Sequence, residues 1–303
     1  MVNHNTSQII GISWMVLHCL LISIMSAMVR DISSQFHVFE IVFFYNFAAF
    51  LFMLPFVFIS GRYKDLRTRK FKLHLSRAIL GVISLTMYFY AFTVIPLTEA
   101  RAIALTGPLV SSLFAIIFLK ERMGWHRTLA LIIGFLGALF ILRPGTASFS
   151  YVYIMVLSSV GMWAVIDLII KIMTRTESAY NQVFYLSGLM SVFSLPGAIF
   201  YWQTPESYSA WATLFGLGAI FLINIIAIFN AFKYADITAV MPFDFSGMVF
   251  TTIIAYLAFN EVIDTPTAIG SLIIVVSSVY IAKREAKQSK GDRPEKCVLR
   301  IRF

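Results

Sequence analysis

Ionisable residues inside otherwise apolar runs are the positions where this sequence could do chemistry, and Asp244 is the clearest of them. It lies in M-P-F-D-F-S-G at 241–247, directly after a Pro–Phe step that interrupts helical hydrogen bonding. In lipid, such a charge costs about 2.5–3.5 kcal/mol at a helix centre, so it is a functional candidate by default. Asp244 could pair with a cationic ligand or carry a proton. The alternative is a buried carboxylate that caps loosened backbone or pairs with a neighbouring helix.

Three further charges lie within apolar runs. Arg101 has a planar guanidinium that suits bidentate binding of a substrate carboxylate. Alternatively, its long side chain could extend to the lipid headgroups. Asp167 and Lys171 are four residues apart and therefore share one helix face, which predicts a structural or gating ion pair rather than a ligand site.

Aromatic and amide side chains inside the same runs add candidates for ligand contact. Aromatic walls suit a sulfonium, an amine or a planar ring, whereas amides hydrogen-bond within a helix bundle. Packing is the open alternative for each aromatic residue, and we expect His18 and Asn224 to hydrogen-bond within the bundle. The residues predicted to bind substrate are Asp244, Arg101, Tyr45, Asn46, Tyr88, Tyr90, Trp163 and Asn230.

Motifs of catalysis and cofactor binding are missing from the sequence. There is no HExxH, no Gly-x-Ser-x-Gly and no phosphate-binding glycine loop. The two cysteines, Cys19 and Cys297, have neither disulfide nor metal-ligand spacing. We therefore predict no catalytic residue, no metal and no cofactor.

Composition excludes a soluble protein. The chain is 59% hydrophobic and 13% charged, where soluble domains are about 25% charged. The net charge of +9 comes from short loops and from a basic tail at 285–303. We expect this tail to fix orientation and contact anionic lipid rather than bind nucleic acid. A homodimer stays open.

Apolar runs that could span a membrane number ten, and most of the 24 Lys and Arg fall in alternate connections between them. By the positive-inside rule, this predicts an all-α protein of the bacterial inner membrane with both termini in the cytoplasm. The expected spans are 9–29, 38–59, 75–95, 98–119, 125–142, 151–172, 179–202, 209–232, 237–259 and 266–282.

An internal repeat organises these spans. A shift of 140 residues places Thr98–Glu121 on Thr238–Glu261, with Gly107 on Gly247 and Glu121 on Glu261. Each half then holds five helices, and because five is odd the two halves must be inverted in the membrane. The predicted units are 1–145, 146–284 and the tail 285–303. Inverted repeats are typical of alternating-access carriers with a site between the halves.

Two pairs of equivalent residues have predicted roles within this repeat. Small residues allow helix backbones to approach closely, so we expect Gly107 and Gly247 to mark helix crossings at which the halves rock. Glu121 and Glu261 both follow the end of an apolar run. We predict that they cap loops or hold the interface between the halves.

Several short motifs carry a family resemblance. They are T-G-P at 106–108, F-L-K-E at 118–121, I-I-G-F-L-G-A-L at 132–139, F-N-E at 259–261 and A-I-G-S-L at 268–272. With these, the chain resembles EamA-type members of the drug/metabolite transporter superfamily. The stretches GISW at 11–14, F-E-I-V-F-F at 39–44 and LPFV at 54–57 are similar to S-adenosylmethionine uptake carriers. The resemblance implies a central cavity lined by helices other than the fifth and tenth.

The leading hypothesis is a secondary carrier of a small polar metabolite, with S-adenosylmethionine favoured. Amino acids, amines and riboflavin-like molecules are the alternative substrates, in either direction. The sequence has no ATP-binding element, so exchange or an ion gradient must supply the energy, and proton coupling through Asp244 is one hypothesis. An integral-membrane enzyme or a channel is disfavoured because the acids are dispersed and the polar residues form no continuous stripe.

Overall fold

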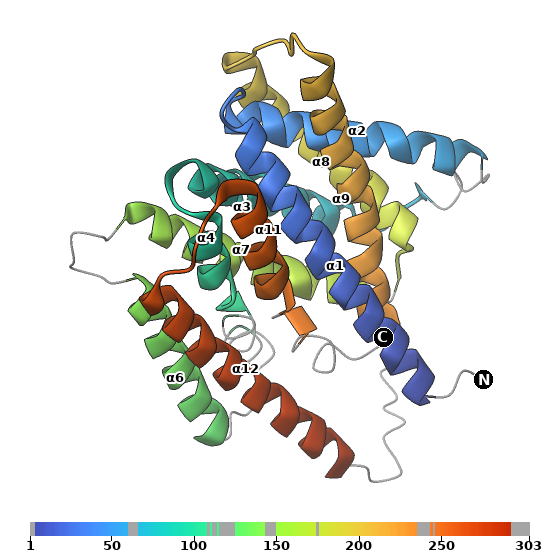
Figure 1. The fold of residues 1–303 in the computed structure, drawn as a ribbon. Helices are drawn as coiled ribbons and strands as arrows, with labels where there is room; N and C mark the ends of the chain where they lie inside the picture. The colour runs from blue at the N-terminus through green and yellow to red at the C-terminus, as the bar shows by residue number, and fades with distance from the viewer. Residues whose placement is uncertain are drawn as a thin grey trace.

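Helices make up the regular structure throughout the described part of the chain, which confirms the all-α prediction (Figure 1). The computed structural model describes residues 4–59, 66–107, 110, 114, 125–142, 150–173, 176–234, 243–244 and 246–291. Its helices are α1 (His4–Ile32), α2 (Val38–Ile59), α3 (Phe71–Val94), α4 (Leu97–Ala104), α6 (Trp125–Leu142), α7 (Tyr151–Met173), α8 (Ala179–Phe200), α9 (Tyr208–Tyr234), α11 (Ser246–Phe259) and α12 (Thr265–Gly291).

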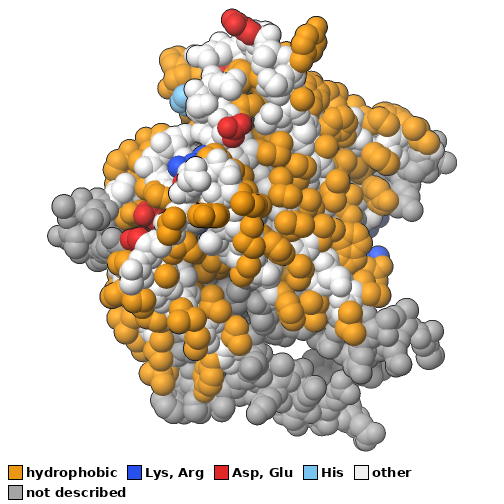
Figure 2. Space-filling view, in the orientation of Figure 1, with side chains coloured by type: hydrophobic (Ala, Val, Ile, Leu, Met, Phe, Trp, Pro, Cys, Tyr) orange, Lys and Arg blue, Asp and Glu red, His pale blue; other side chains and the backbone are white. Residues whose placement is uncertain are grey.

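Six of these helices, α1, α2, α3, α7, α8 and α9, are long and apolar enough to cross a membrane, and α11 and the first half of α12 are shorter apolar helices. A crossing needs about 20 apolar residues for a hydrocarbon core of about 30 Å. Apolar side chains also cover most of the surface visible in Figure 2, as expected for a surface that faces lipid tails. The protein is therefore a multi-pass membrane protein.

Helix packing follows the repeat. Helix α1 packs on α9 as α7 packs on α3, and α2 packs on α9 as α8 packs on α3. Helices α2 and α8, and likewise α6 and α12, are equivalent helices of the two halves that pack against each other. Helix α1 also packs on α11, and the contact of α7 with α4, in the corresponding apolar run of the first half, is smaller among the described residues. Most of the large contacts therefore have a counterpart when the two halves are exchanged. Figure 1 shows α6 and α12 running side by side at the edge of the bundle.

Helix backbones approach most closely at glycines other than the two predicted. A Cβ added at Gly218 in α9 would lie 2.8 Å from the backbone nitrogen of Ala49 in α2. Likewise, one at Gly270 would lie 2.8 Å from the carbonyl oxygen of Gly137. At Gly107, by contrast, the nearest atom would be 3.8 Å away. The close crossings thus occur between α2 and α9 and between α6 and α12, and a hinge role for Gly107 stays a prediction.

The described residues of the fourth and ninth apolar runs depart from the α-helical conformation at equivalent positions, which are called the two interruptions. Helix α4 ends at Ala104 and a turn follows at Leu105 and Thr106. Helix α11 begins at Ser246, after a short 3₁₀ turn at Phe243–Asp244. The 140-residue shift places Ala104 on Asp244, so both interruptions fall at one point of the repeat. Discontinuous helices of this kind line binding sites in carriers, because their freed backbone groups can face a cavity.

Candidate functional site

A central cavity of about 220 Å³ lies among helices from both halves. Its described lining comes from α1, α2, α3, α7, α8 and α9, together with α4 and Asp244 beside the two interruptions. No described residue of α6 or α12, the fifth and tenth helices, lines it. This arrangement agrees with the expectation from the family resemblance. The cavity is where the bundle can hold a small molecule.

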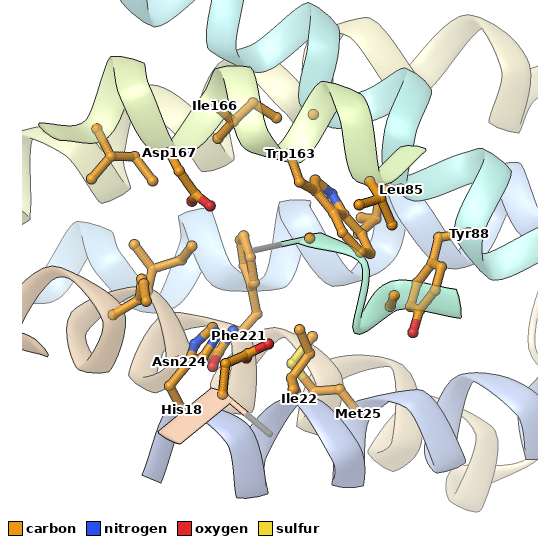
Figure 3. A pocket seen from close by; sticks show the side chains of 18 of the residues that line it. His18, Ile22, Met25, Leu85, Tyr88, Trp163, Ile166, Asp167, Phe221 and Asn224 are labelled. Carbon is orange, nitrogen blue, oxygen red and sulfur yellow. The ribbon is translucent and has the colours of Figure 1, made fainter. Parts of the chain in front are cut away.

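Aromatic rings form much of the cavity wall. Tyr88 and Trp163 meet edge to face with ring centroids 4.6 Å apart, and Tyr45 and Phe221 do so at 4.5 Å. In the view of Figure 3, Trp163 and Tyr88 lie towards one end of the cavity, and Asp167 lies towards the other. Such a wall can stack against a planar ring or surround a cation.

The structure brings the two leading candidates, Arg101 and Asp244, together as an ion pair. Nη2 of Arg101 lies 3.4 Å from Oδ1 of Asp244 and donates to its backbone oxygen at 3.0 Å. The Cys19 thiol donates to the same carboxylate, with Sγ 3.6 Å from Oδ1. Arg101 is 7% exposed and therefore does not extend to lipid headgroups. The pair joins the interruption after α4 to the one before α11.

The guanidinium of Arg101 lies directly against Gly247. A Cβ there would lie 2.8 Å from Cζ and 3.0 Å from Nε of Arg101. Gly247 thus leaves space for the side chain of Arg101, and not for the close approach of a second helix backbone that was predicted there. The equivalent Gly107 has no such neighbour.

A second pair of opposite charges faces the cavity without forming an ion pair. Arg77 in α3 is 2% exposed, and its Nη1 donates to Oε1 of Gln182 at 3.0 Å, while its Nε has no partner. Asp167 in α7 lines the cavity, and no described residue forms a hydrogen bond or ion pair with it. The predicted partner of Asp167, Lys171, has a side chain outside the described residues. Arg77 and Asp167 attract each other across the cavity, but within the described part of the chain neither of them has an ion-pair partner.

Three predicted substrate contacts lie away from the cavity. Asn46 is buried and donates from Nδ2 to the carbonyl oxygen of Val42 at 2.7 Å. The hydroxyl of Tyr90 lies 3.2 Å from that of Tyr151 in an exposed position. Neither these two residues nor Asn230 is part of the lining. Of the eight predicted substrate contacts, the lining contains Asp244, Arg101, Tyr45, Tyr88 and Trp163.

Glu261 has the capping role predicted for it. Its carboxylate accepts weak hydrogen bonds from the backbone nitrogens of Leu97 at 3.4 Å and Thr98 at 3.5 Å, at the start of α4. It also pairs with Arg30 at 2.7 Å, and this guanidinium lies 5.1 Å from the ring centroid of Phe259. The ends of α1, α4 and α11 are thereby joined. The equivalent Glu121 is outside the described residues.

Other lining residues were not predicted as site residues. Arg77 is near the start of the expected span 75–95, where a basic residue is typical of the cytoplasmic end, whereas α3 begins at Phe71 and holds Arg77 inside the bundle. His18 and Asn224, which are expected to hydrogen-bond within the bundle, interact with each other, and both line the cavity (Figure 3). Nδ1 of His18 and Oδ1 of Asn224 have no partner among the described residues. The signal that could have identified His18 and Asn224 as site residues is their position in the middle of an apolar run.

Comparison with known proteins identifies the family. Residues 9–143 and 150–283 each match the EamA-like transporter family. This chain belongs to that family. A solved crystal structure with 18% sequence identity superposes at a TM-score of 0.64, covering 93% of this chain and 99% of the other, which shows a shared fold. Residues capable of holding a metal ion do not gather anywhere in the described part of this family member.

Relatives of known function are transporters of different substrates. An S-adenosylmethionine uptake transporter of Rickettsia felis is 31% identical over 91% of this chain and 94% of its own length. A riboflavin transporter of Vibrio cholerae is 30% identical over 81% of this chain and 83% of its own length. A pseudopaline exporter of Pseudomonas aeruginosa is 28% identical over 90% of this chain and 96% of its own length. The family thus supports transport of a small molecule, in preference to enzymatic activity.

Proposed function

We propose that this protein is a secondary carrier of the bacterial inner membrane that moves S-adenosylmethionine into the cell or exchanges it. The observation that carries the proposal is the central cavity, which combines an aromatic wall with the carboxylate of Asp167, for which no partner exists among the described residues. S-Adenosylmethionine has a planar adenine, a sulfonium cation and an amino-acid group. Aromatic faces attract both the ring and the cation, and a carboxylate attracts a positive group.

The relatives support this substrate more than the alternatives. The S-adenosylmethionine transporter resembles this chain over nearly its whole length. Riboflavin is the second candidate, because the Vibrio cholerae relative has a comparable identity and the Tyr88–Trp163 pair could stack on a flavin ring. Riboflavin bears no positive charge, however, and would leave Asp167 unneutralised. The pseudopaline relative is an exporter, so the direction of transport needs its own measurement.

Alternating access would follow from the two similar halves. The lining extends to Ile170 and Phe232, near the ends of α7 and α9. These ends of α7 and α9 face the cytoplasm if the N-terminus and the C-terminus of the chain both lie in the cytoplasm. At the opposite ends of the bundle, Glu261 joins α1, α4 and α11. In this proposal the structure has its cavity directed to the cytoplasm, and opening to the outside requires the Arg30–Glu261 pair to separate. Exchange or an ion gradient drives the cycle.

The test is counterflow in proteoliposomes that are loaded with unlabelled S-adenosylmethionine and diluted into labelled substrate. Wild-type protein is expected to accumulate label, and Asp167→Asn to lose most of this uptake. The matched control is Asp31→Asn, which removes an exposed carboxylate at the end of α1 and should leave uptake unchanged. Exchange of riboflavin with no exchange of S-adenosylmethionine would overturn the proposed substrate.

A further inference from the structure

We propose that Arg77 and Asp167 bind the amino-acid head group of the substrate: Arg77 the carboxylate and Asp167 the ammonium. The specificity-determining feature is then a zwitterion, an ammonium and a carboxylate on the same carbon. This inference rests on the proposed function of the cavity as a transport site. It goes further by assigning a role to two charged residues and by naming the part of the substrate that they read.

Arg77 and Asp167 differ from the other two charged residues of the cavity in that they form no ion pair with a described residue. Arg101 and Asp244 neutralise each other at 3.4 Å, and Asp244 also accepts from Cys19. Arg77, in contrast, has only the neutral amide of Gln182 as a partner, and Asp167 has none among the described residues. Unpaired charges within the bundle are costly, so a ligand that supplies the opposite charge to each is stabilised there.

The placement of the two side chains fits a ligand between them. Their helices, α3 and α7, pack against each other, and both residues line the same cavity. Yet no atoms of the two side chains come within ion-pair distance, since the described ion pairs are Arg30–Glu261 and Arg101–Asp244. Gln182 holds one end of the guanidinium, and the buried Nε remains without a partner. A planar guanidinium with free donors is well suited to a carboxylate.

The aromatic wall lies where the rest of such a substrate would extend. Trp163 is four residues before Asp167 on α7, so the two side chains share one helix face about 6 Å apart along the axis. Tyr88 contacts Trp163 on the side of the ring remote from Asp167 in the view of Figure 3. With the head group bound at Asp167, the rest of the substrate would therefore extend along Trp163 towards Tyr88.

The test uses analogues that separate the contribution of the head group from that of the sulfonium charge. Competition against labelled S-adenosylmethionine would compare S-adenosylhomocysteine, which keeps the head group and loses the sulfonium charge, with 5′-methylthioadenosine, which lacks the head group. Decarboxylated S-adenosylmethionine removes only the carboxylate. We expect S-adenosylhomocysteine to compete well and the other two to be about 10- to 100-fold weaker, as loss of a charged hydrogen bond implies.

Substitutions then connect each ligand group to its residue. Arg77→Gln should weaken S-adenosylmethionine about 10- to 100-fold and leave decarboxylated S-adenosylmethionine unchanged, because that ligand has no carboxylate for Arg77 to bind. Asp167→Asn should weaken both. Since Arg77→Gln could impair folding, Arg77→Lys provides a second variant, which keeps the charge and loses the planar fork. It should fall between wild type and Arg77→Gln.

Failure of this inference is distinguishable from failure of the proposed function. If S-adenosylmethionine exchanges but 5′-methylthioadenosine competes equally well, the head-group site is overturned and the substrate assignment stands. If S-adenosylmethionine does not exchange but methionine does and its decarboxylated amine does not, the substrate assignment fails and the head-group site stands. Exchange of riboflavin alone would overturn both.

Discussion

Substituting Gly247 by alanine should break the Arg101–Asp244 ion pair without altering either charged residue. The added Cβ would lie 2.8 Å from Cζ and 3.0 Å from Nε of Arg101, distances shorter than an ordinary van der Waals contact. Since Gly247 is within helix α11, its backbone cannot retreat easily, and the guanidinium must move instead. Its hydrogen bond to the backbone oxygen of Asp244 at 3.0 Å is then lost together with the ion pair.

The size of this effect can be worked from its parts. Replacing glycine by alanine inside a helix gains about 0.5–1 kcal/mol. A hydrogen bond to a charged group contributes about 1.5–3 kcal/mol, and breaking a buried ion pair costs about 3–5 kcal/mol when one partner is removed. Arg101 is displaced rather than removed, so the lower figures apply. We expect a net destabilisation of about 2 kcal/mol.

The internal repeat supplies a matched control, Gly107→Ala. This residue is equivalent to Gly247, but a Cβ there would meet only Cγ1 of Val160 at 3.8 Å. Gly107→Ala should therefore leave stability unchanged or raise it slightly. The assay is thermal unfolding of both variants in detergent micelles, followed by tryptophan fluorescence. A double-mutant cycle with Asp244→Asn completes it, because Gly247→Ala should cost much less once the ion pair is already gone.

Two results would refute this reasoning. If Gly247→Ala and Gly107→Ala destabilise the protein equally, the space at Gly247 is not specific to Arg101. If the effect of Gly247→Ala is the same with and without the Asp244 carboxylate, it does not act through the ion pair.

Three further perturbations have defined outcomes. Gly218→Ala would press against the backbone of α2 at 2.8 Å and should abolish monodisperse protein on size exclusion, while Gly161→Ala, with nothing within 4 Å, should not. Glu261→Gln keeps the cap of α4 and loses the charge of a partly exposed pair, so its melting temperature should fall by the equivalent of roughly 1 kcal/mol or less, and less still in 1 M salt. Burial lowers the pKa of His37, whose ring stacks on Tyr201 at 3.8 Å. The unfolded chain therefore binds more protons between the two pKa values, and stability should fall as pH drops below about 6.5, less steeply in His37→Gln.

The fold was largely predictable because apolar length and repetition leave few alternatives. Apolar runs define where helices form in lipid, since unpaired backbone groups cannot be tolerated there. The contacts between helices were not predicted, but most of the large ones pair helices that the 140-residue shift makes equivalent or have an equivalent contact in the other half. What length could not predict was the interruption at Leu105 and Thr106, because neither residue breaks a helix by itself. The local signals were the Gly107–Pro108 step directly after this turn and the Pro–Phe step before Asp244 in the second half.

The site was predictable in part, for a different physical reason. A charge in an apolar run signals function, and this rule identified Asp244, Arg101 and Asp167. It did not indicate that Arg101 and Asp244 pair, because their contact depends on how two helices from different halves meet. The rule also missed Arg77, because it is near the cytoplasmic end of its apolar run, where a basic residue is ordinary. Tyr90 and Asn46 lie in the same apolar runs but do not line the cavity, since position along a helix does not say which face meets it.

The charges that define the cavity are those that the repeat does not duplicate. The 140-residue shift places Asp244 on Ala104, Arg77 on Leu217 and Asp167 on Ala27. A faithful duplication would bring like residues together where the halves meet, and like charges would repel in a medium of low dielectric constant. Divergence between the halves allows Arg101 to meet Asp244 across the two interruptions and leaves Arg77 and Asp167 unpaired. The repeated part of the sequence thus builds the cavity, and its unrepeated residues determine which charges a substrate must neutralise.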